Sequence, residues 1–296
     1  MGTGPAVVLG AGGAAGWAFH AGVLAGMAEV GLDLATATTV VATSAGAPVA
    51  ASILAGATPD EIVSSLLRPP TDEEIARYRE RLAEARSNWR SRLRPVAPRL
   101  AGAMLPGGAG VGVALAGLLP SGLFPTTPLR RAPGVEDLAD RWPPGLWIPA
   151  VGLDDGQRVV FGRDRRDLAV ADAIEASQAV PVMFAPRWID GAAFVDGATH
   201  SPTNADLLVG SDGAARPGDV LLVAPMSRHP NRLMRRFARR RLREELEVLR
   251  QAGLRVTVVL PDDETASHLD GFPRKDPEAI PLVVAGGHRA ALAALG

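Results

Sequence analysis

The sequence has no cysteine, and aromatic residues make up only 4% of it. The absence of cysteine excludes disulfide bonds and thiolate metal ligands, and it fits a reducing compartment. An excess of either charge is also missing, because 31 basic and 32 acidic residues leave a formal net charge of −1. The chain as a whole therefore has no electrostatic bias toward nucleic acid. Its 296 residues are enough for an unassisted hydrophobic core.

The sequence also lacks a recognisable targeting or membrane-spanning segment. The first ten residues, MGTGPAVVLG, have no basic start and run directly into a glycine-rich turn, so no signal peptide is predicted. Residues 100–129 are uncharged and long enough to cross a bilayer, but their prolines and glycines disfavour a spanning helix. We expect a cytoplasmic protein, and peripheral membrane association stays open.

A strand–turn–helix pattern occurs twice near the start of the sequence. Residues 5–9 form an apolar run, residues 10–16 a glycine-rich turn, and residues 17–30 a helical segment. Residues 38–43 are β-branched and predict a second strand, and the segment from Ala45 to about Gly56 predicts a buried helix. Such units predict parallel strands with crossover helices. We therefore expect an α/β fold with a mainly parallel central sheet flanked by helices on both faces.

The rest of the sequence predicts one domain over residues 1–296, interrupted by an apolar, Pro/Gly-rich insertion near residues 95–128 that looks irregular or mobile. Capping boxes at Thr58–Glu61 and Thr71–Glu74 precede helices, the second of them amphipathic and running through Trp89 and Leu93. Further strands are expected at residues 146–153, 158–161, 193–195, 220–224 and 255–260, and further helices at residues 170–177 and 232–251.

Ser44 is the candidate nucleophile of this sequence. It lies in the pentapeptide ATSAG, residues 42–46, between a predicted strand and a predicted helix, which is the context of a nucleophile elbow. A sharp turn there would lift the hydroxyl above the sheet, and the N-terminus of the helix would favour a developing anion. The alternative is that Ser44 only caps the helix, as serine often does.

A nucleophilic serine also needs a base and donors for an oxyanion. The backbone N–H groups of residues 10–16 can serve as donors, because glycine lets an amide approach a reacting oxygen closely. Asp196 follows an apolar strand and opens a turn, and burial would raise its low pKa toward that of a useful base. A turn aspartate is also common for structural reasons. None of the histidines has a decisive context: His20, His200, His229, His268 and His288.

Taken together, these segments resemble the patatin-like phospholipase family. The parts that carry the resemblance span most of residues 5–225 and are LGAGGAAGWAFHAGVL, ATSAGAPVAA, GLFPTTPLRR and ASQAVPVMFAPRWIDGAAFVDGA, in this order. The resemblance implies a three-layer α/β/α fold and a Ser–Asp dyad without histidine, Ser44 as nucleophile and Asp196 as general base. It places the oxyanion hole at Gly12 and Gly13, with Gly10 as a further candidate.

The same resemblance implies the reaction. It is hydrolysis of carboxylic esters of lipids, of the phospholipase A or lysophospholipase type, through an acyl-enzyme and with no cofactor or metal. Two positions depart from the family pattern. Ala42 replaces the first glycine of the elbow, which bears on its packing, and Ala15 replaces a frequently basic residue, which bears on binding of an anionic headgroup.

Two segments are candidates for contact with a lipid surface. Residues 100–124 are apolar and could form a lid over an acyl pocket. Residues 228–250 hold nine arginines against three glutamates, with apolar residues interleaved, and a basic amphipathic helix can rest on anionic lipid. The alternative for the second segment is an ordinary solvated helix that covers the sheet. Nucleic-acid binding is a weaker interpretation, because no nucleic-acid motif surrounds it.

Three other functions compete with lipid hydrolysis by a dyad. Residues 10–15 fit a dinucleotide-binding fingerprint, but the second strand ends without the carboxylate that such a site needs. A conventional Ser–Asp–His triad would make His200 or His268 essential. A catalytically silent lipid-binding protein could retain the same fold, and Ser44-dependent labelling by a fluorophosphonate ester would distinguish it from an enzyme.

Overall fold

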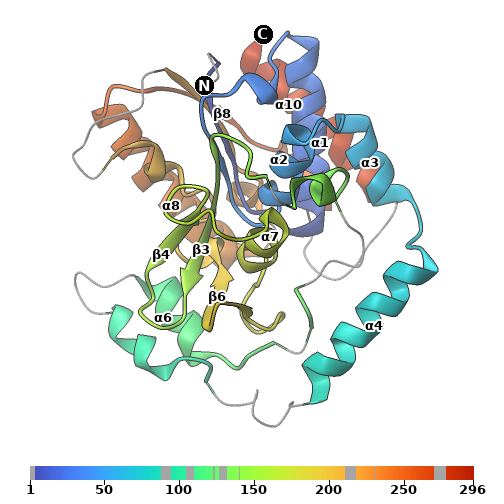
Figure 1. Ribbon diagram of the computed structural model, residues 1–296. Helices are drawn as coiled ribbons and strands as arrows, with labels where there is room; N and C mark the ends of the chain where they lie inside the picture. The colour runs from blue at the N-terminus through green and yellow to red at the C-terminus, as the bar shows by residue number, and fades with distance from the viewer. Residues whose placement is uncertain are drawn as a thin grey trace.

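The structure is a computed structural model that describes residues 4–87, 95–104, 110–122, 124–126, 132–139, 141–210, 218–229, 231–269 and 278–296. An eight-stranded mixed sheet forms its centre (Figure 1). The strands are β1 (Ala6–Leu9), β2 (Val40–Ala42), β3 (Leu146–Gly152), β4 (Arg158–Phe161), β5 (Arg187–Ile189), β6 (Ala192–Asp196), β7 (Asp219–Val223) and β8 (Arg255–Val259).

The sheet has a parallel part and an antiparallel part. The order is β5-β6-β3-β2-β1-β7-β8, with β4 paired to β3 away from this path. Strands β3, β2, β1, β7 and β8 run parallel to their neighbours in this series, whereas β4, β6 and β5 pair antiparallel. The expected α/β fold with a mainly parallel sheet is confirmed, and the antiparallel pairing of β6 with β3 and β5 is the detail that the sequence did not predict.

Helices cover both faces of this sheet. The α-helices are α1 (Gly13–Glu29), α2 (Gly46–Leu54), α3 (Pro59–Leu67), α4 (Asp72–Ser87), α6 (Val111–Leu118), α7 (Val170–Ser177), α8 (Arg232–Gln251), α9 (Asp263–His268) and α10 (Ala279–Leu295). Helices α1 and α10 lie on one side of the strands and α8 on the other (Figure 1). Short 3₁₀ turns connect them: η1 (Leu34–Thr36), η2 (Pro98–Met104), η3 (Val135–Leu138), η4 (Gly197–Thr199), η5 (Ala205–Leu208) and η6 (Pro225–Arg228).

Alternating side chains along the strands create two cores. Val7 and Leu9 of β1 join the cluster beneath α1, α2 and α10, while Ala6 and Val8 join the cluster beneath α8. This alternation follows from the two-residue period of a strand. Because both faces are buried, the central strands are apolar throughout, as expected for parallel strands covered by helices.

Several expected boundaries agree with the structure and others are corrected. Both capping boxes form, at Thr58–Glu61 and at Thr71–Glu74. Helix α1 begins at Gly13, inside the stretch expected to be a turn, and β5, α9 and α10 were not predicted. Trp89 and Leu93, predicted to continue α4, lie outside the described residues.

The insertion near residues 95–128 is more regular than expected where the structure describes it. It contains η2 and the helix α6, which pack against each other. Residues 105–109, 123 and 127–131 lie outside the described part, so the predicted lid over residues 100–124 and the GLFPTTPLRR segment are described only in part. Within the described residues, no helix is both long and apolar enough to cross a bilayer.

Candidate active site

Ser44 lies in a sharp turn between β2 and α2. Its backbone φ of +53° is in the left-handed region, which a non-glycine residue seldom adopts, and strain of this kind is found at functional sites. A Cβ at Gly46 would lie 2.2 Å from the Leu9 carbonyl oxygen, so only glycine lets the turn pack against β1. Ala42 fits in the core with no exposed surface, so its extra methyl does not prevent the elbow from forming.

Helix α2 begins at Gly46, two residues after Ser44. The first N–H groups of a helix carry the positive end of its dipole, which favours negative charge. The Ser44 N–H itself donates to Ser177 Oγ at 3.0 Å, and the Ser177 hydroxyl donates to the Pro149 carbonyl at 2.8 Å. Ser177 thus connects the elbow to β3. Nothing in the local sequence marks Ser177 as part of the site, because only the fold brings it to the turn.

Asp196 is the last residue of β6 and is 1% exposed. Its N–H donates to the Ala179 carbonyl at 3.0 Å, and its Oδ1 accepts the Ala198 N–H at 2.7 Å. A Cβ at Gly197 would lie 2.3 Å from the Pro149 carbonyl oxygen, so the glycine of this turn lets it pack closely on β3. Both backbone and side chain of Asp196 are therefore held in one orientation.

Strand β3 lies between the strand that leads to Ser44 and the strand that ends in Asp196. Val41 of β2 pairs with Trp147 of β3, and Ser44 lies in the turn just past the end of β2. Asp196, at the end of β6, pairs with Ala150 from the other side of β3. The two residues, 152 positions apart in the sequence, thus lie at the ends of the two strands that flank β3.

Their side chains also interact. Burial raises the pKa of Asp196 to about 7, while hydrogen bonding from the Ala198 N–H and from the Ser44 hydroxyl opposes this rise. Asp196 Oδ2 has no hydrogen-bond partner within the described residues. The proximity of the Ser44 hydroxyl to this buried carboxyl defines the candidate site.

The backbone N–H groups of the glycine-rich loop beside Ser44 differ in whether they already donate a hydrogen bond. The Gly10 N–H donates to the Val223 carbonyl at 3.0 Å and the Ala11 N–H to the Pro202 carbonyl at 2.8 Å, so both are already used. Gly13 has a φ of +62° and is exposed, and it begins α1, where the first N–H groups have no partner within the helix. Gly12 and Gly13 therefore remain candidate oxyanion donors, and Gly10 is the weakest of the three.

His20 is buried in α1 and holds this loop from below. Its Nε2 lies 2.6 Å from the Gly10 carbonyl oxygen, and burial lowers its pKa to about 4. The ring is thus neutral near pH 7 and donates from Nε2 to that carbonyl. His20 is therefore a core histidine that helps to order the glycine-rich loop through Nε2, while its buried Nδ1 has no hydrogen-bond partner among the described residues.

The other histidines lie in different surroundings. His200 Nε2 lies 3.4 Å from the Arg241 guanidinium, and burial together with the positive charge of Arg158 lowers the pKa of His200 to about 4. His288 pairs with Glu29, and His229 accepts the Asn231 N–H. None of these contacts involves Ser44 or Asp196. Among the described residues, no cluster of His, Asp and Glu side chains could hold a metal ion.

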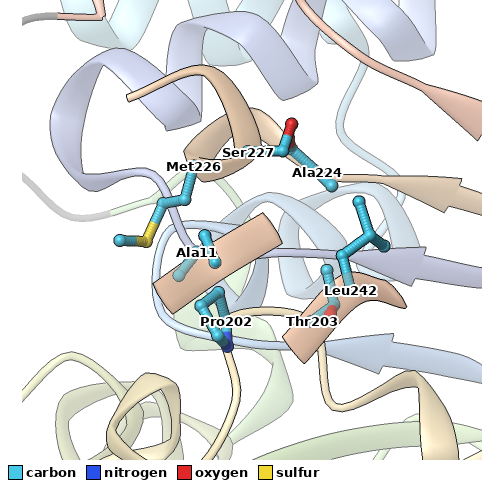
Figure 2. A pocket seen from close by; sticks show the side chains of 8 residues that line it. Ala11, Pro202, Thr203, Ala224, Met226, Ser227 and Leu242 are labelled. Carbon is cyan, nitrogen blue, oxygen red and sulfur yellow. The ribbon is translucent and has the colours of Figure 1, made fainter. Parts of the chain in front are cut away.

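A small hollow borders the oxyanion loop on the α8 side of the sheet (Figure 2). Ala11 of the loop, Met226 of η6 and Leu242 of α8 are among the side chains around it. It leaves no room for even a water-sized sphere, so it is packing space behind the loop and cannot accept a lipid acyl chain.

Comparison with solved structures gives distant matches. One is VipD from Legionella pneumophila, with 14% identity and a TM-score of 0.49, covering 99% of this chain and 66% of that one. Another is ExoU from Pseudomonas aeruginosa in its complex with SpcU, with 19% identity and a TM-score of 0.38, covering 98% of this chain and 53% of that one. The chain thus spans about half to two thirds of the length of these structures. No curated protein matches the sequence.

The sequence profile of one family matches a large part of the chain. The profile of patatin-like phospholipases aligns with residues 7–209, which is more than half of the chain and includes the glycine-rich loop, Ser44 and Asp196. The chain belongs to the patatin-like phospholipase family.

Proposed function

We propose that this protein is a serine hydrolase that cleaves acyl esters of lipids with Ser44 as nucleophile and Asp196 as its only catalytic partner. The observation that carries the proposal is the meeting of the Ser44 hydroxyl with a buried carboxyl whose pKa is raised to about 7. An aspartate with its ordinary pKa is a poor base toward serine, whereas a pKa near the working pH suits general base catalysis.

In the first step, ionised Asp196 takes the proton of the Ser44 hydroxyl as Oγ attacks the ester carbonyl carbon. The carbonyl oxygen becomes an oxyanion, and the N–H groups of Gly12 and Gly13 stabilise it together with the N-termini of α1 and α2. The tetrahedral intermediate then collapses, the alcohol leaves with the proton held by Asp196, and Ser44 stays acylated. Each oxyanion donor contributes about 10²–10³ in rate in well-studied hydrolases.

In the second step, water attacks the acyl-enzyme. Asp196 accepts a proton from this water, a second oxyanion forms in the same hole, and Ser44 Oγ leaves with the proton. The products are a free carboxylic acid and the restored enzyme. Both steps use the same base in the same position, so the reaction needs no third residue.

The surroundings of the histidines support a dyad over a triad. The groups that shift the pKa of Asp196 are its burial, the Ala198 N–H and the Ser44 hydroxyl, and no histidine is among them. His200, which is nearest to Asp196 in sequence, faces the Arg241 guanidinium. Single replacement of His200 or His268 is therefore expected to leave esterase activity within about three-fold of wild type.

The test is an assay of the purified protein against short nitrophenyl esters and a small panel of phospholipids and lysophospholipids. The proposal predicts release of free fatty acid by wild type and none above background by Ser44→Ala. Mass analysis of the lipid products identifies which acyl position is cleaved. Absence of Ser44-dependent hydrolysis of every ester in the panel would refute the enzyme and leave the lipid-binding alternative.

We also propose that the start of α8 contacts the anionic lipid surface on which the substrate lies. Residues 228–243 hold eight arginines and no acidic residue, and the first turn of α8 has no acidic side chain. A positive charge in the first turn opposes the helix dipole, so the charge of Arg232 does not stabilise the start of α8. Leu233 is 75% exposed and Met234 43% exposed between them.

The start of α8 also lies at the catalytic edge of the sheet. Val223 ends β7 level with Leu9 of β1, and η6 leads from there to α8. Among the described residues, Arg232 and Arg236 form no ion pair, and both are exposed. A negatively charged lipid surface would therefore meet a basic and apolar helix end beside the oxyanion loop.

Vesicle sedimentation tests this contact. Phosphatidylcholine vesicles with anionic phosphatidylglycerol are expected to bind wild type more tightly than neutral vesicles, and Arg232→Gln/Arg236→Gln to lose most of this difference. Arg250→Gln, at the other end of α8, is the matched control and should bind like wild type. Equal binding by both variants would contradict the assignment. The single domain over residues 1–296 and the cytoplasmic location stay predictions.

A further inference from the structure

We propose that Asn204 is a positioning residue that ties the turn of Ser44 to the turn of Asp196 and so sets the distance between them. This inference rests on the proposed function. Asn204 is fully buried and lies in the segment after η4, eight residues beyond Asp196. It was not singled out in the sequence, since nothing local distinguishes it from an ordinary turn asparagine.

The side-chain nitrogen of Asn204 reaches both turns. Nδ2 donates toward Thr43 Oγ1 at 3.2 Å, and Thr43 directly precedes Ser44. The same nitrogen lies 3.3 Å from the carbonyl oxygen of Gly197, which directly follows Asp196, and 2.5 Å from that of Ser201. One amide group thus contacts the chain neighbours of both proposed catalytic residues, 161 positions apart in the case of Thr43.

The backbone of Asn204 explains why the residue is an asparagine. Its φ of +52° and ψ of +29° are left-handed, a conformation that asparagine tolerates better than other residues with a side chain. Glycine would fit this backbone but would supply no amide. Aspartate would supply acceptors where two carbonyl oxygens already need a donor.

The other end of the amide is anchored to β4. Asn204 Oδ1 accepts from Arg158 Nη1 at 3.0 Å, and the same guanidinium holds Asp206 through Nη1 at 2.8 Å and Nη2 at 2.6 Å. Burial would raise the pKa of Asp206, but the hydrogen bonds and charge of Arg158 lower it overall. The guanidinium therefore fixes the amide orientation, with its oxygen toward β4 and its nitrogen toward the two turns.

Helix α8 holds the same segment from the other side. Glu245 is buried, and its Oε2 accepts the Thr203 hydroxyl and the Ala205 N–H, on both sides of Asn204. The Asn204 side chain is also buried, and because its Nδ2 donates and its Oδ1 accepts a hydrogen bond, it has little freedom to move. Asn204 is thus fixed by β4 and α8, and it transmits this rigidity to the elbow and to the Asp196 turn.

The experiment compares kcat and KM of a short nitrophenyl ester for Asn204→Gly and Asp190→Gly. Asp190 also has a left-handed backbone, φ +48°, but its side chain is 69% exposed, so its variant is the matched control for a glycine replacement. We expect Asn204→Gly to lower kcat at least about ten-fold with KM within about two-fold, because small displacements of reacting groups are costly. We expect Asp190→Gly to match wild type.

Thr43 tests the same connection from its other end and covers the case in which Asn204→Gly does not fold. Thr43→Val keeps the shape and removes the acceptor, and it should lower kcat about three-fold or more without changing KM. Thr43→Ser restores the hydroxyl and should recover most of that loss. A purely structural role would instead lower the melting temperature of Thr43→Val and leave kcat of the folded protein unchanged.

The outcomes separate this inference from the proposed function. If wild type shows no Ser44-dependent hydrolysis, the proposed function fails and the inference fails with it. If wild type hydrolyses the ester through Ser44 but folded Asn204→Gly or Thr43→Val keeps a kcat within about two-fold of Asp190→Gly, the inference alone is overturned. A kcat loss with unchanged KM in Thr43→Val, reversed in Thr43→Ser, supports it.

Discussion

The parallel and antiparallel parts of the sheet each contribute one half of the proposed site, and they do so differently. On the parallel side, Ser44 and the glycine loop follow directly from neighbouring strands β2 and β1. On the antiparallel side, Asp196 reaches the site only because β6 pairs with β3 in one register. A one-residue slip of β6 would turn Asp196 to the opposite face of the sheet.

This difference separates local from long-range determinants of the site. The elbow is defined by a few consecutive residues and by close packing at Gly46. The position of the carboxyl depends on β3, on Gly197 against Pro149 and on Asn204, which lie far apart in the sequence. In the proposed mechanism, the parallel side therefore supplies the reacting group, and the antiparallel side supplies the base that activates it.

The largest expected fall in kcat comes from replacing Ser44, on the parallel side of the sheet. Ser44→Ala removes the only group proposed to carry the acyl chain, so kcat should fall at least about 10³-fold. Circular dichroism should match wild type, because the residue is small and the turn stays intact. Ester hydrolysis by the folded variant above about a tenth of the wild-type rate would mean that another residue is the nucleophile.

The next largest fall in kcat is expected from replacing Asp196, on the antiparallel side of the sheet. Asp196→Asn keeps the shape and the Ala198 contact but cannot take a proton, so kcat should fall about 10²–10⁴-fold, the usual contribution of a general base. His200→Asn is the matched control, since His200 lies close in sequence but faces Arg241. A larger fall in kcat for His200→Asn than for Asp196→Asn would contradict the assignment of Asp196 as the general base.

A smaller fall in kcat is expected from a change in the glycine-rich loop that is proposed to hold the oxyanion. Gly13→Ala places a Cβ on a left-handed residue and should displace its amide, lowering kcat about 10–100-fold. Gly31, just beyond α1, has a φ of +78°, and a Cβ there would have no neighbouring atom within 4 Å, so Gly31→Ala carries the same backbone strain away from the site. Thermal unfolding should show similar losses for both, and only Gly13→Ala should lose activity.

The smallest effect concerns stability and its dependence on pH. The pKa of Asp196 in the folded protein, about 7, lies above its ordinary value, so its contribution to stability is present below about pH 4 and lost as the pH rises through 7. Asp196→Asn has no such loss. Relative to wild type it should gain roughly 1–3 kcal/mol between about pH 4.5 and pH 8.

Urea unfolding of both proteins at the two pH values measures this gain. Glu245 also has a pKa raised to about 7, by burial and by the negative charge of Asp206, but it is present in both proteins and cancels in the difference. A pH-independent difference would indicate that Asp196 is already ionised at low pH, contrary to a buried base.

The same contrast explains what the sequence could predict. Ser44, the glycine loop and Asp196 are parts of contiguous motifs, and β1, β2 and their helices are determined by local periodicity. The antiparallel pairing of β6 with β3 joins Ala150 to Asp196 and depends on long-range register, and β5 has only three residues. Neither leaves a clear local pattern.

Helix α10 was not predicted from the sequence for a different reason. Its sequence contains Pro281, Gly286 and Gly287, which disfavour a helix locally. The proline is tolerated in the first turn, where its missing N–H costs little. A Cβ at Gly287 would lie 2.3 Å from the Phe19 carbonyl oxygen, so the glycine serves close packing on α1. Ser177, Asn204 and the role of His20 were likewise identified only by the contacts that the fold creates.

The most direct test of the account is the rate at which a fluorophosphonate ester labels Ser44, measured by mass spectrometry of the modified peptide across about pH 5–9. The account predicts a single adduct on Ser44, a rate that rises with a midpoint near pH 7 as Asp196 loses its proton, and near-complete loss of labelling in Asp196→Asn. Labelling of Asp196→Asn at the wild-type rate would contradict the meeting of the two residues as a catalytic pair.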